Sequence, residues 1–297
     1  MSNSSHNHSH HHDISSNRIA LVFFLNLFFT IIEFIGGILT NSTAIMADAV
    51  HDLGDTLSIG MAWLLNSLSK KNPTHNFTYG FHRFSLLGAL LNGLILISGS
   101  TWVLSQAIPK LYEPVMPHTL GMFWLAILGV TVNGYAAWKI SAGKTLNEKM
   151  LNWHLLEDVL GWLSVLIVSI VLMFFNWPIL DSLLSILFTL FILINVVKNT
   201  RTTVKIFLQS TPDTEMLNAI RAKLRALEYV KAIHYLHLWS LDGERHVLSA
   251  HLEISDMINA EKQIELKQKI KTALIEFSLE NTTIEFELPT EICRNDS

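Results

Sequence analysis

The chain has 297 residues, of which 50% are hydrophobic and 15% charged, and its mean hydropathy is +0.36. This composition is too apolar for an ordinary soluble domain, so we predict a polytopic α-helical membrane protein. The formal net charge of −4 gives no indication of a nucleic-acid partner, and the single cysteine, Cys293, excludes a disulfide framework and a cysteine-rich zinc module, so we expect any metal site to use His, Asp and Glu.

The first seventeen residues are polar and rich in histidine. We predict that residues 1–17 form a disordered tail, because they have too few apolar side chains to build a core. Five of the fourteen histidines of the chain lie here: His6, His8, His10, His11 and His12. Such a tract binds metal loosely without folding. The alternative is a cloning tag, but the interrupted spacing favours a tract that captures metal.

Six apolar runs follow, each long enough to cross about 30 Å of hydrocarbon. They comprise residues 19–40, 43–68, 84–108, 120–140, 150–175 and 179–197. Lysine and arginine are concentrated before the first run, in the connections after the second and fourth runs, and after the last run. The connections on the opposite side of the membrane have little more than Lys110. By the positive-inside rule both termini face the cytoplasm. We therefore predict a six-helix transmembrane domain over residues 18–209.

The composition changes after residue 211. The segment DTEMLNAIRAKLRALE has helical apolar spacing, and VKAIHYLHLWSL and RHVLSAHLEIS are typical of two strands around a tight turn. A second helix is predicted in AEKQIELKQKIKTALIEF, and a last strand in TTIEFEL. The order α-β-β-α-β predicts a small cytoplasmic α+β domain over residues 210–297, of the metallochaperone or ferredoxin-like type.

Charged residues interrupt two of the predicted spans in the same pattern. His51 and Asp55 lie four residues apart in the second span, and His154 and Asp158 repeat this spacing in the fifth. Residues four apart share one face of a helix. Counted at 1.5 Å per residue, His51 and Asp158 lie about 13 Å inside their spans, from opposite sides of the membrane. We therefore expect the two pairs to meet near mid-membrane.

A carboxylate buried in hydrocarbon costs about 2.5 to 3.5 kcal/mol on insertion scales, so these residues need a compensating partner. Two imidazoles and two carboxylates fit tetrahedral zinc, whereas magnesium prefers six oxygen ligands. The alternative is that they line a wet crevice or pair with Lys or Arg, but neither span has a basic residue in its interior. We therefore predict a metal site formed by His51, Asp55, His154 and Asp158.

Several segments resemble those of the cation diffusion facilitator family, the zinc-exporting group of six-span transporters with a cytoplasmic domain. They occur in order along nearly the whole chain: NSTAIMADAVHDLGDTLS, YGFHRF, WHLLEDVLGW, ILDSLLS and AIHYLHLWSLDG. The resemblance implies a homodimer in a bacterial cytoplasmic membrane that exports zinc, with cadmium as a further candidate, in exchange for protons. It also implies that the four predicted metal ligands are the transport site and that Zn²⁺ is cargo, with no prosthetic group. Histidine titrates near pH 6.5, so protons can compete with metal for these atoms.

Other polar residues of the spans are weaker candidates. Asp48 and Asp52 lie close to the site along the second span, and we expect them to support its ligands or to line the exit path of the ion. An equal alternative is that they merely line water near the outer surface. We expect Glu33, Asn133 and Asp181 to form hydrogen bonds between helices rather than to bind metal.

The predicted C-terminal domain carries a second group of candidate ligands. His234 and His251 lie on adjacent strands, and Glu285 and Glu287 lie on the last strand with same-face spacing. Members of the family that the chain resembles bind zinc at corresponding places, so the resemblance implies a metal site here. Its ligand set stays open, and ordinary surface residues of the strands are the alternative.

Two other classes of function compete with transport. An intramembrane metalloenzyme needs a general base such as the glutamate of HExxH, and no HExxH occurs, so we expect no enzyme activity. A membrane-anchored metal sensor would leave four ionisable residues at mid-membrane unexplained, whereas a transporter needs them there. Export of another main metal, such as cobalt, nickel, manganese or iron, is the principal alternative to zinc export.

Overall fold

The structure is a computed structural model of the chain, and it describes residues 10–69, 71, 73–141, 146–291 and 293. For residues 10–22, 62–63, 65–67, 69, 139–140 and 146–154 it describes the backbone alone. The chain divides into two units. The helical unit comprises residues 1–70 and 88–200, and the α+β unit comprises residues 71–87 and 201–297.

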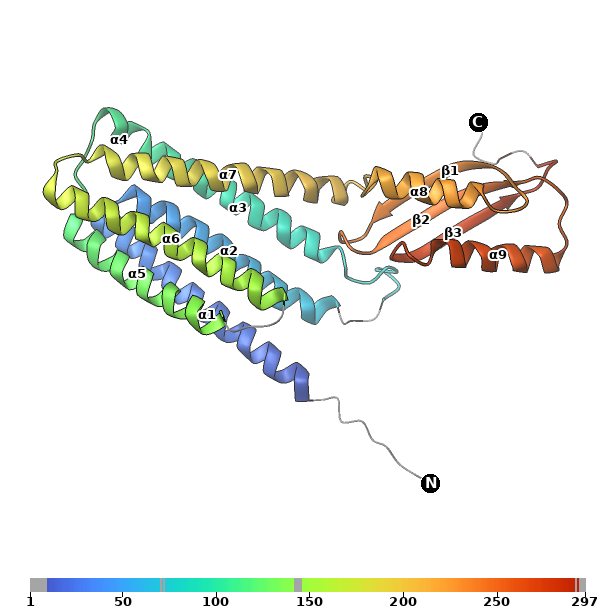
Figure 1. The fold of residues 1–297 in the computed structure, drawn as a ribbon, viewed down its shortest axis with the longest axis horizontal. Coiled ribbons are helices and arrows are strands. Elements are labelled where there is room, and N and C mark those ends of the chain that lie inside the picture. Colours follow the sequence, from blue (N-terminus) through green and yellow to red (C-terminus); the bar gives the residue numbers. More distant parts are fainter. Residues whose placement is uncertain (1–9, 70, 72, 142–145, 292, 294–297) are drawn as a thin grey trace, which may run out of the picture. The chain divides into compact units, whose positions relative to one another are not determined.

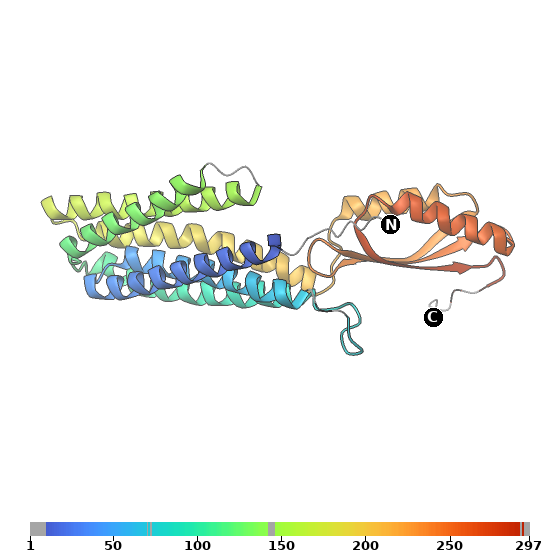
Figure 2. The same cartoon turned by 90° about the horizontal axis from the view of Figure 1, so that it is seen from below.

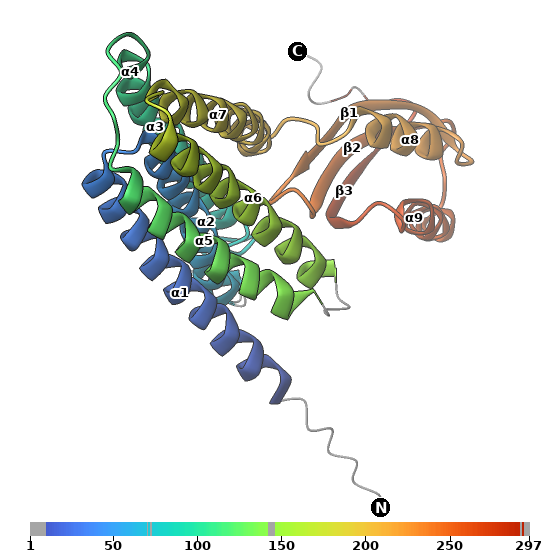
Figure 3. The ribbon, with the colours of Figure 1, turned by 60° about the vertical axis from the view of Figure 1, so that its left-hand side comes forward.

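Six long helices follow the predicted apolar runs in the part of the chain that the structure describes (Figure 1). They are α1 (His10–Thr40), α2 (Thr43–Ser69), α3 (Phe84–Ala107), α5 (Thr119–Ile140), α6 (Leu146–Phe174) and α7 (Ile179–Phe207), and the short α4 (Pro109–Tyr112) follows α3. α1 packs against α2 and α5, α5 against α6, and α2 against α6 (Figure 3). Because α1 begins at His10, the backbone of residues 10–17 is helical where we expected a disordered tail. A helix nucleated in an apolar run can extend into polar sequence with one further hydrogen bond per residue.

Among the residues that the structure describes, five helices are long and apolar enough to span a membrane: α1, α3, α5, α6 and α7. α2 is as long as these, with 27 residues, but it carries the three aspartates Asp48, Asp52 and Asp55. Because α2 packs between its apolar neighbours α1 and α6, it forms the sixth span. The fold is therefore a six-helix membrane domain followed by a small α+β domain.

One core cluster of the helical unit lies between α1, α2, α5 and α6. Its buried members include Phe29, Ile45, Met122 and Trp162. A Cβ atom at Gly129 of α5 would lie 2.1 Å from the Trp162 ring, so only glycine leaves room for the indole. The Trp162 ring of α6 therefore packs directly on the α5 backbone, which allows the two helices to approach closely.

Hydrogen bonds join the N-terminal end of α7 to the N-terminal end of α2. The buried Asp181 carboxylate accepts hydrogen bonds from the Ser42 hydroxyl at 2.5 Å, the Thr43 backbone N–H at 2.7 Å and the Thr43 hydroxyl at 2.8 Å. The Ser185 hydroxyl donates to the Thr43 carbonyl at 2.9 Å. A carboxylate at a helix N-terminus satisfies N–H groups that have no partner within the helix. The expected interhelical role of Asp181 is confirmed.

We expect Asp181→Ala to destabilise the helical unit by about 3 kcal/mol, because it leaves several buried donors unpaired at about 1 to 3 kcal/mol each. Asp181→Asn keeps an acceptor oxygen and should lose less. The measurement is the midpoint of thermal unfolding of the purified protein in detergent, with Glu113→Ala, the loss of an exposed carboxylate, as the control. If Asp181→Ala unfolds at the same temperature as the unmutated protein, α2 does not need this cap.

The α+β unit contains a three-stranded sheet with two helices on one face (Figure 2). Its elements are α8 (Thr214–Arg225), β1 (Val230–Ser240), β2 (His246–Ile254), α9 (Ala260–Leu274) and β3 (Leu279–Glu287), in the predicted order. The central strand β2 is antiparallel to β1 and parallel to β3. The parallel pair requires a crossover connection, which α9 supplies.

Successive residues of the strands alternate between the face of the sheet that packs on the core and the face that carries the candidate site. Leu248 and Leu252 of β2 belong to the core that the sheet shares with α8 and α9. Successive strand residues point to opposite faces, so His251 lies on the face away from these helices. Backbone pairing sets His234 of β1 and Glu285 of β3 on either side of His251. Three predicted site residues are thus neighbours across the sheet.

Candidate functional site

The first half of the predicted membrane site lies on α2. The Nε2 atom of His51 lies 3.5 Å from the Oδ2 atom of Asp55, one helical turn further on. Their side chains are 16% and 23% exposed, so both are largely buried within the helical unit. The His51 ring meets the Phe188 ring of α7 edge to face, with 6.0 Å between centroids. The predicted common face of the pair is confirmed.

The second half of the predicted site lies on α6. Asp158 is buried and interacts electrostatically with Asp48 of α2. The Oδ1 atom of Asp48 also lies 3.4 Å from the position of a Cβ atom on Gly161, so a polar side chain of α2 packs directly on the α6 backbone. His154 lies one turn before Asp158 in α6, and its side chain is outside the described part of the structure. The interface between α2 and α6 therefore carries carboxylates from both helices.

Further acidic side chains surround this interface. Asp48 and Asp52 on α2 are 3% and 5% exposed, Asp158 is 7% exposed, and Glu33 on α1 is 1% exposed. Glu33 interacts electrostatically with the other three, and Asp48 interacts in addition with Asp55. We expected Glu33 to form hydrogen bonds between helices, and its carboxyl group interacts with Asp52 of the neighbouring α2. The structure makes it a member of a cluster of carboxyl groups from three helices.

These carboxyl groups cannot all be ionised unless a cation balances them. Two like charges 4 Å apart repel by about 4 kcal/mol at an effective dielectric constant of 20. The described side chains of α1, α2 and α6 include no lysine or arginine. The charge is therefore balanced by protons or by a bound cation. A site with this requirement can exchange one for the other.

A cavity of 240 Å³ opens beside Asp48, between α2, α6 and α7. Its lining includes Glu157 and Gly161 of α6, and most of the other lining residues are apolar. A water molecule takes up about 30 Å³ of the liquid, so the cavity has room for an ion with part of its hydration shell. Glu157 was not among the predicted site residues. In the sequence, Glu157 is an acidic residue inside a predicted span. It was missed because it does not belong to a histidine–aspartate pair with a spacing of four residues.

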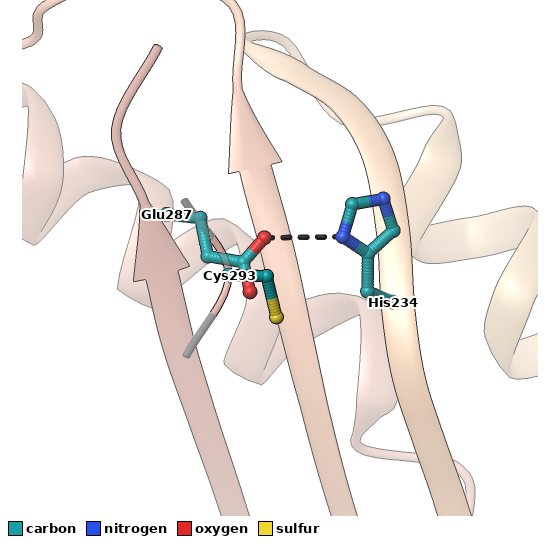
Figure 4. Close-up of side chains that lie close together, drawn as sticks. All are labelled: His234, Glu287 and Cys293. Carbon is teal, nitrogen blue, oxygen red and sulfur yellow. Dashed lines mark hydrogen bonds and ion pairs between the residues drawn. The ribbon is translucent and has the colours of Figure 1, made fainter. Parts of the chain in front are cut away.

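The second predicted site lies on the sheet of the α+β unit. The Glu287 carboxylate of β3 accepts hydrogen bonds from His251 Nδ1 at 2.7 Å and from His234 Nδ1 at 3.1 Å, and Figure 4 shows the latter bond. Glu285 lies farther off, with its Oε2 atom 3.7 Å from His251 Nε2. The structure therefore brings His234, His251 and Glu287 together and leaves Glu285 at the margin.

Cys293 lies in the same cluster, which corrects the expectation that only His, Asp and Glu are available for a metal site. Its thiol is buried, and the Sγ atom lies 3.5 Å from His251 Nδ1. One ligand atom each of His234, Glu287 and Cys293 lies within 4.8 Å of the others. Spacing along the chain could not predict this contact, because Cys293 returns to the sheet through the segment that follows β3.

The Glu287 carboxylate is ionised at neutral pH. Burial opposes its charge, but hydrogen bonds from Cys293 and His251 and the electrostatic interaction with the His234 and His251 imidazoles outweigh burial and hold the pKa of Glu287 below its usual value. A carboxyl group whose pKa is lowered by folding stabilises the fold above its unfolded pKa, and this contribution is lost as the pH falls. The cluster therefore favours folding at neutral pH and weakens in acid.

The N-terminal candidates cannot be placed in the same way. His6 and His8 lie outside the described residues. His10, His11 and His12 lie in the first turn of α1, where the structure describes the backbone alone. Their role in metal capture stays a prediction.

Two family models match the chain. The model of the "Cation efflux transmembrane domain" matches residues 19–208, which include all the acidic residues of the α2–α6 interface. The model of the "Cation efflux protein, cytoplasmic domain" matches residues 212–288, which include the strands of the second cluster. Together the two models cover most of the chain.

Bacterial relatives are similar over nearly their full length. The "Cadmium, cobalt and zinc/H(+)-K(+) antiporter" of Bacillus subtilis strain 168 is 30% identical over 294 residues, which cover 98% of this chain and 94% of the relative. The "Metal cation efflux system protein CzcD" of Cupriavidus metallidurans is 30% identical over 286 residues, 95% of this chain and 90% of the relative. The "Zinc transporter ZitB" of Escherichia coli K12 is 28% identical over 291 residues, 95% and 92% of the two chains. The chain therefore belongs to the cation efflux family of membrane transporters, as the resemblance of its motifs to cation diffusion facilitators predicts.

Proposed function

We propose that this protein is a secondary transporter that exports Zn²⁺ in exchange for protons, through a site formed by His51, Asp55, His154 and Asp158. The observation that carries the proposal is the His51–Asp55 pair on α2 within a buried cluster of acids that includes Asp158 of α6. Imidazole nitrogen and carboxylate oxygen bind tetrahedral zinc at about 2.0 to 2.2 Å. The zinc and cadmium transporters among the relatives support this choice of cargo.

Coupling to protons follows from the charge of the site. A divalent ion neutralises two carboxylates, and when it leaves, the same oxygens and imidazoles can take up protons. Metal and protons therefore compete for one set of atoms. In this proposal Asp48 and Asp52 support the ligands and border the path of the ion, which includes the cavity lined by Asp48 and Glu157.

The proposal places the protein in a bacterial cytoplasmic membrane as a homodimer with both termini in the cytoplasm. The Lys and Arg distribution supports the orientation, and the match to a dimer domain of this family supports the dimer. The chain is then divided into a histidine-rich tail (1–17), a transport domain (18–209) and a cytoplasmic domain (210–297). The cytoplasmic domain binds a second zinc ion at the cluster of His234, His251 and Glu287.

The test is zinc uptake by proteoliposomes that contain the full chain and a zinc-sensitive dye. We expect uptake when the lumen is more acidic than the medium, and loss of net uptake when an ionophore collapses the pH gradient. Uptake that ignores the gradient would contradict proton exchange. Absence of any flux for zinc, cadmium and manganese, with metal still bound by the protein, would favour a membrane-anchored sensor.

A wider range of metals is the second candidate function. It is favoured by relatives whose names include cadmium and cobalt as well as zinc. The same assay with cadmium, cobalt, nickel, manganese and iron separates a zinc exporter from an exporter of another main metal. Zinc is expected to be carried best, because imidazole suits zinc whereas harder ions prefer oxygen ligands alone.

We expect deletion of residues 2–16 to lower the apparent affinity for zinc modestly, by about two- to fivefold, without abolishing transport. A histidine-rich tract ahead of the first span can raise the local zinc concentration but cannot gate a path through the helices. The measurement is the zinc dependence of the initial uptake rate. A matched control replaces His6, His8, His10, His11 and His12 with serine at unchanged length. Complete loss of transport by a normally inserted deletion variant would make the tract part of the mechanism.

A further inference from the structure

We propose that the connection between α2 and α3, residues 70–83, is a membrane anchor that binds anionic lipid headgroups. The proposal depends on α2 and α3 being membrane spans and not on which ion crosses the helical unit. Its basis is a cluster of aromatic rings at the start of α3, in a connection whose lysine and arginine charges are not opposed by any aspartate or glutamate of its own.

Chain continuity sets the aromatic cluster at the membrane boundary. The part of the chain around α3 that is apolar enough to span a membrane begins at Phe84. The centroid of the Phe84 ring lies 5.8 Å from that of Phe77 and 5.7 Å from that of Phe81, and the latter two are 5.0 Å apart. The three rings therefore form one cluster at the level where α3 enters the bilayer, and aromatic side chains at this depth bury their rings in the interface.

Two aromatic side chains of the connection are not covered by the protein. Phe77 is 45% exposed and Tyr79 is 44% exposed. Large apolar side chains that are exposed together mark an interaction surface. A bilayer interface would bury the Phe77 ring and leave the Tyr79 hydroxyl among the headgroups, since tyrosine combines an apolar body with a polar tip.

Hydrogen bonds of the backbone fix the shape of this surface. The N–H groups and carbonyls of Thr74 and Phe77 form two mutual hydrogen bonds, each of 3.1 Å. The Gly80 N–H donates to the same Phe77 carbonyl at 2.9 Å, and Gly80 has a φ of +73°, which glycine adopts readily. Thr78 and Tyr79 therefore lie in a closed turn. Because the turn exists before lipid binds, binding costs little conformational entropy.

The charge of the connection determines which lipids it binds. Its permanently charged side chains are all basic: Lys70, Lys71 and Arg83. The sequence has no acidic residue between Asp55 and Glu113, so neither the second half of α2 nor α3 brings a negative charge to this surface. Lys71 is exposed. A basic side chain near a membrane surface raises the affinity for anionic lipid by about fivefold.

His82 contacts the α+β unit instead of lipid. Arg245 Nη1 donates to His82 Nε2 at 3.0 Å, and the Asp242 carboxylate accepts from Arg245 Nε at 2.8 Å. The Arg245 guanidinium thus balances the negative charge of Asp242 beside the connection. Lys71 and the two exposed rings are the groups that meet an anionic lipid.

The test sets a fluorescent reporter at the tip of the turn in the full-length protein in liposomes. Cys293 is the one cysteine of the chain, so a protein with Cys293→Ser and Thr78→Cys takes a thiol-reactive dye at residue 78 alone. Phosphatidylcholine and phosphatidylglycerol, each spin-labelled near the top of an acyl chain, quench from the bilayer, and iodide quenches from water. We expect both lipids to quench the dye, phosphatidylglycerol more strongly at equal mole fraction, and iodide to have little effect.

Two substitutions separate the aromatic contribution from the charge. Tyr79→Ser should lower quenching by both lipids and admit iodide, and it spares the three phenylalanine rings that pack on one another. Lys71→Gln should lower the preference for phosphatidylglycerol over phosphatidylcholine by about fivefold and leave quenching by phosphatidylcholine unchanged. The matched control, Asn76→Ser, changes another exposed residue of the connection and should alter neither.

Three results would overturn the proposal. Quenching by iodide alone would show that the turn lies in water. Quenching by neither iodide nor lipid would show that protein, such as a second copy of the chain, covers it. Equal quenching by the two lipids would show that the connection does not select anionic headgroups. The experiment measures no ion flux, so its outcome is independent of the transport proposal.

Discussion

Asp55→Ala and Asp158→Ala are each expected to abolish proton-coupled zinc transport, with a loss of at least about 100-fold in the initial rate. Removal of a residue that merely supports a metal ligand costs about 10- to 100-fold in affinity, and these substitutions remove a proposed ligand itself. The fold should persist, because each change removes one negative charge that repels the buried Asp48 carboxylate. The measurement is zinc flux into liposomes with a pH-sensitive dye in the same lumen.

The control for this experiment is Glu113→Ala, which removes an exposed carboxylate of the same unit. Both site variants should purify as the unmutated protein does and keep its unfolding temperature within a few degrees. If Asp55→Ala still exchanges zinc for protons at the unmutated rate, the four predicted ligands are not the transport site. The buried charges would then need another explanation.

His51→Asp should change which ions are carried rather than stop transport. It replaces an imidazole nitrogen with a harder carboxylate oxygen at a position 3.5 Å from the second α2 candidate, Asp55. Oxygen-rich sites suit manganese better than imidazole sites do. We therefore expect zinc flux to fall and the ratio of cadmium or manganese flux to zinc flux to rise by about tenfold, which corresponds to about 1.4 kcal/mol of relative affinity.

A second histidine gives the matched control. His75→Asp makes the same chemical change in the exposed connection between α2 and α3 and should leave the flux ratios unaltered. Flux ratios are measured for each ion alone and for equimolar pairs in competition. Unchanged selectivity in a His51→Asp protein that still transports would show that His51 does not contact the ion.

Sequence alone determined the features of this protein that depend on local pattern. Runs of apolar residues predicted six spans, and helices occupy all six. Helical and alternating apolar spacing after residue 211 predicted the α-β-β-α-β order, which the structure has. The four-residue spacing of His51 and Asp55 predicted that they share one face of a helix, where their side-chain atoms lie 3.5 Å apart. These predictions needed no knowledge of how one element lies against another.

Only the tertiary structure decided the contacts between distant parts of the chain. It set Glu33 of α1 among the acids of α2 and α6, and it set Asp181 of α7 on the first turn of α2. It also brought Cys293 to the strands that carry His234 and Glu287. Such contacts depend on the rotation of each helix about its axis and on the path of the chain after the last strand. Hydrophobic periodicity predicts which face of an element is buried but not which residue of another element meets it, so these partners could be found only in the folded chain.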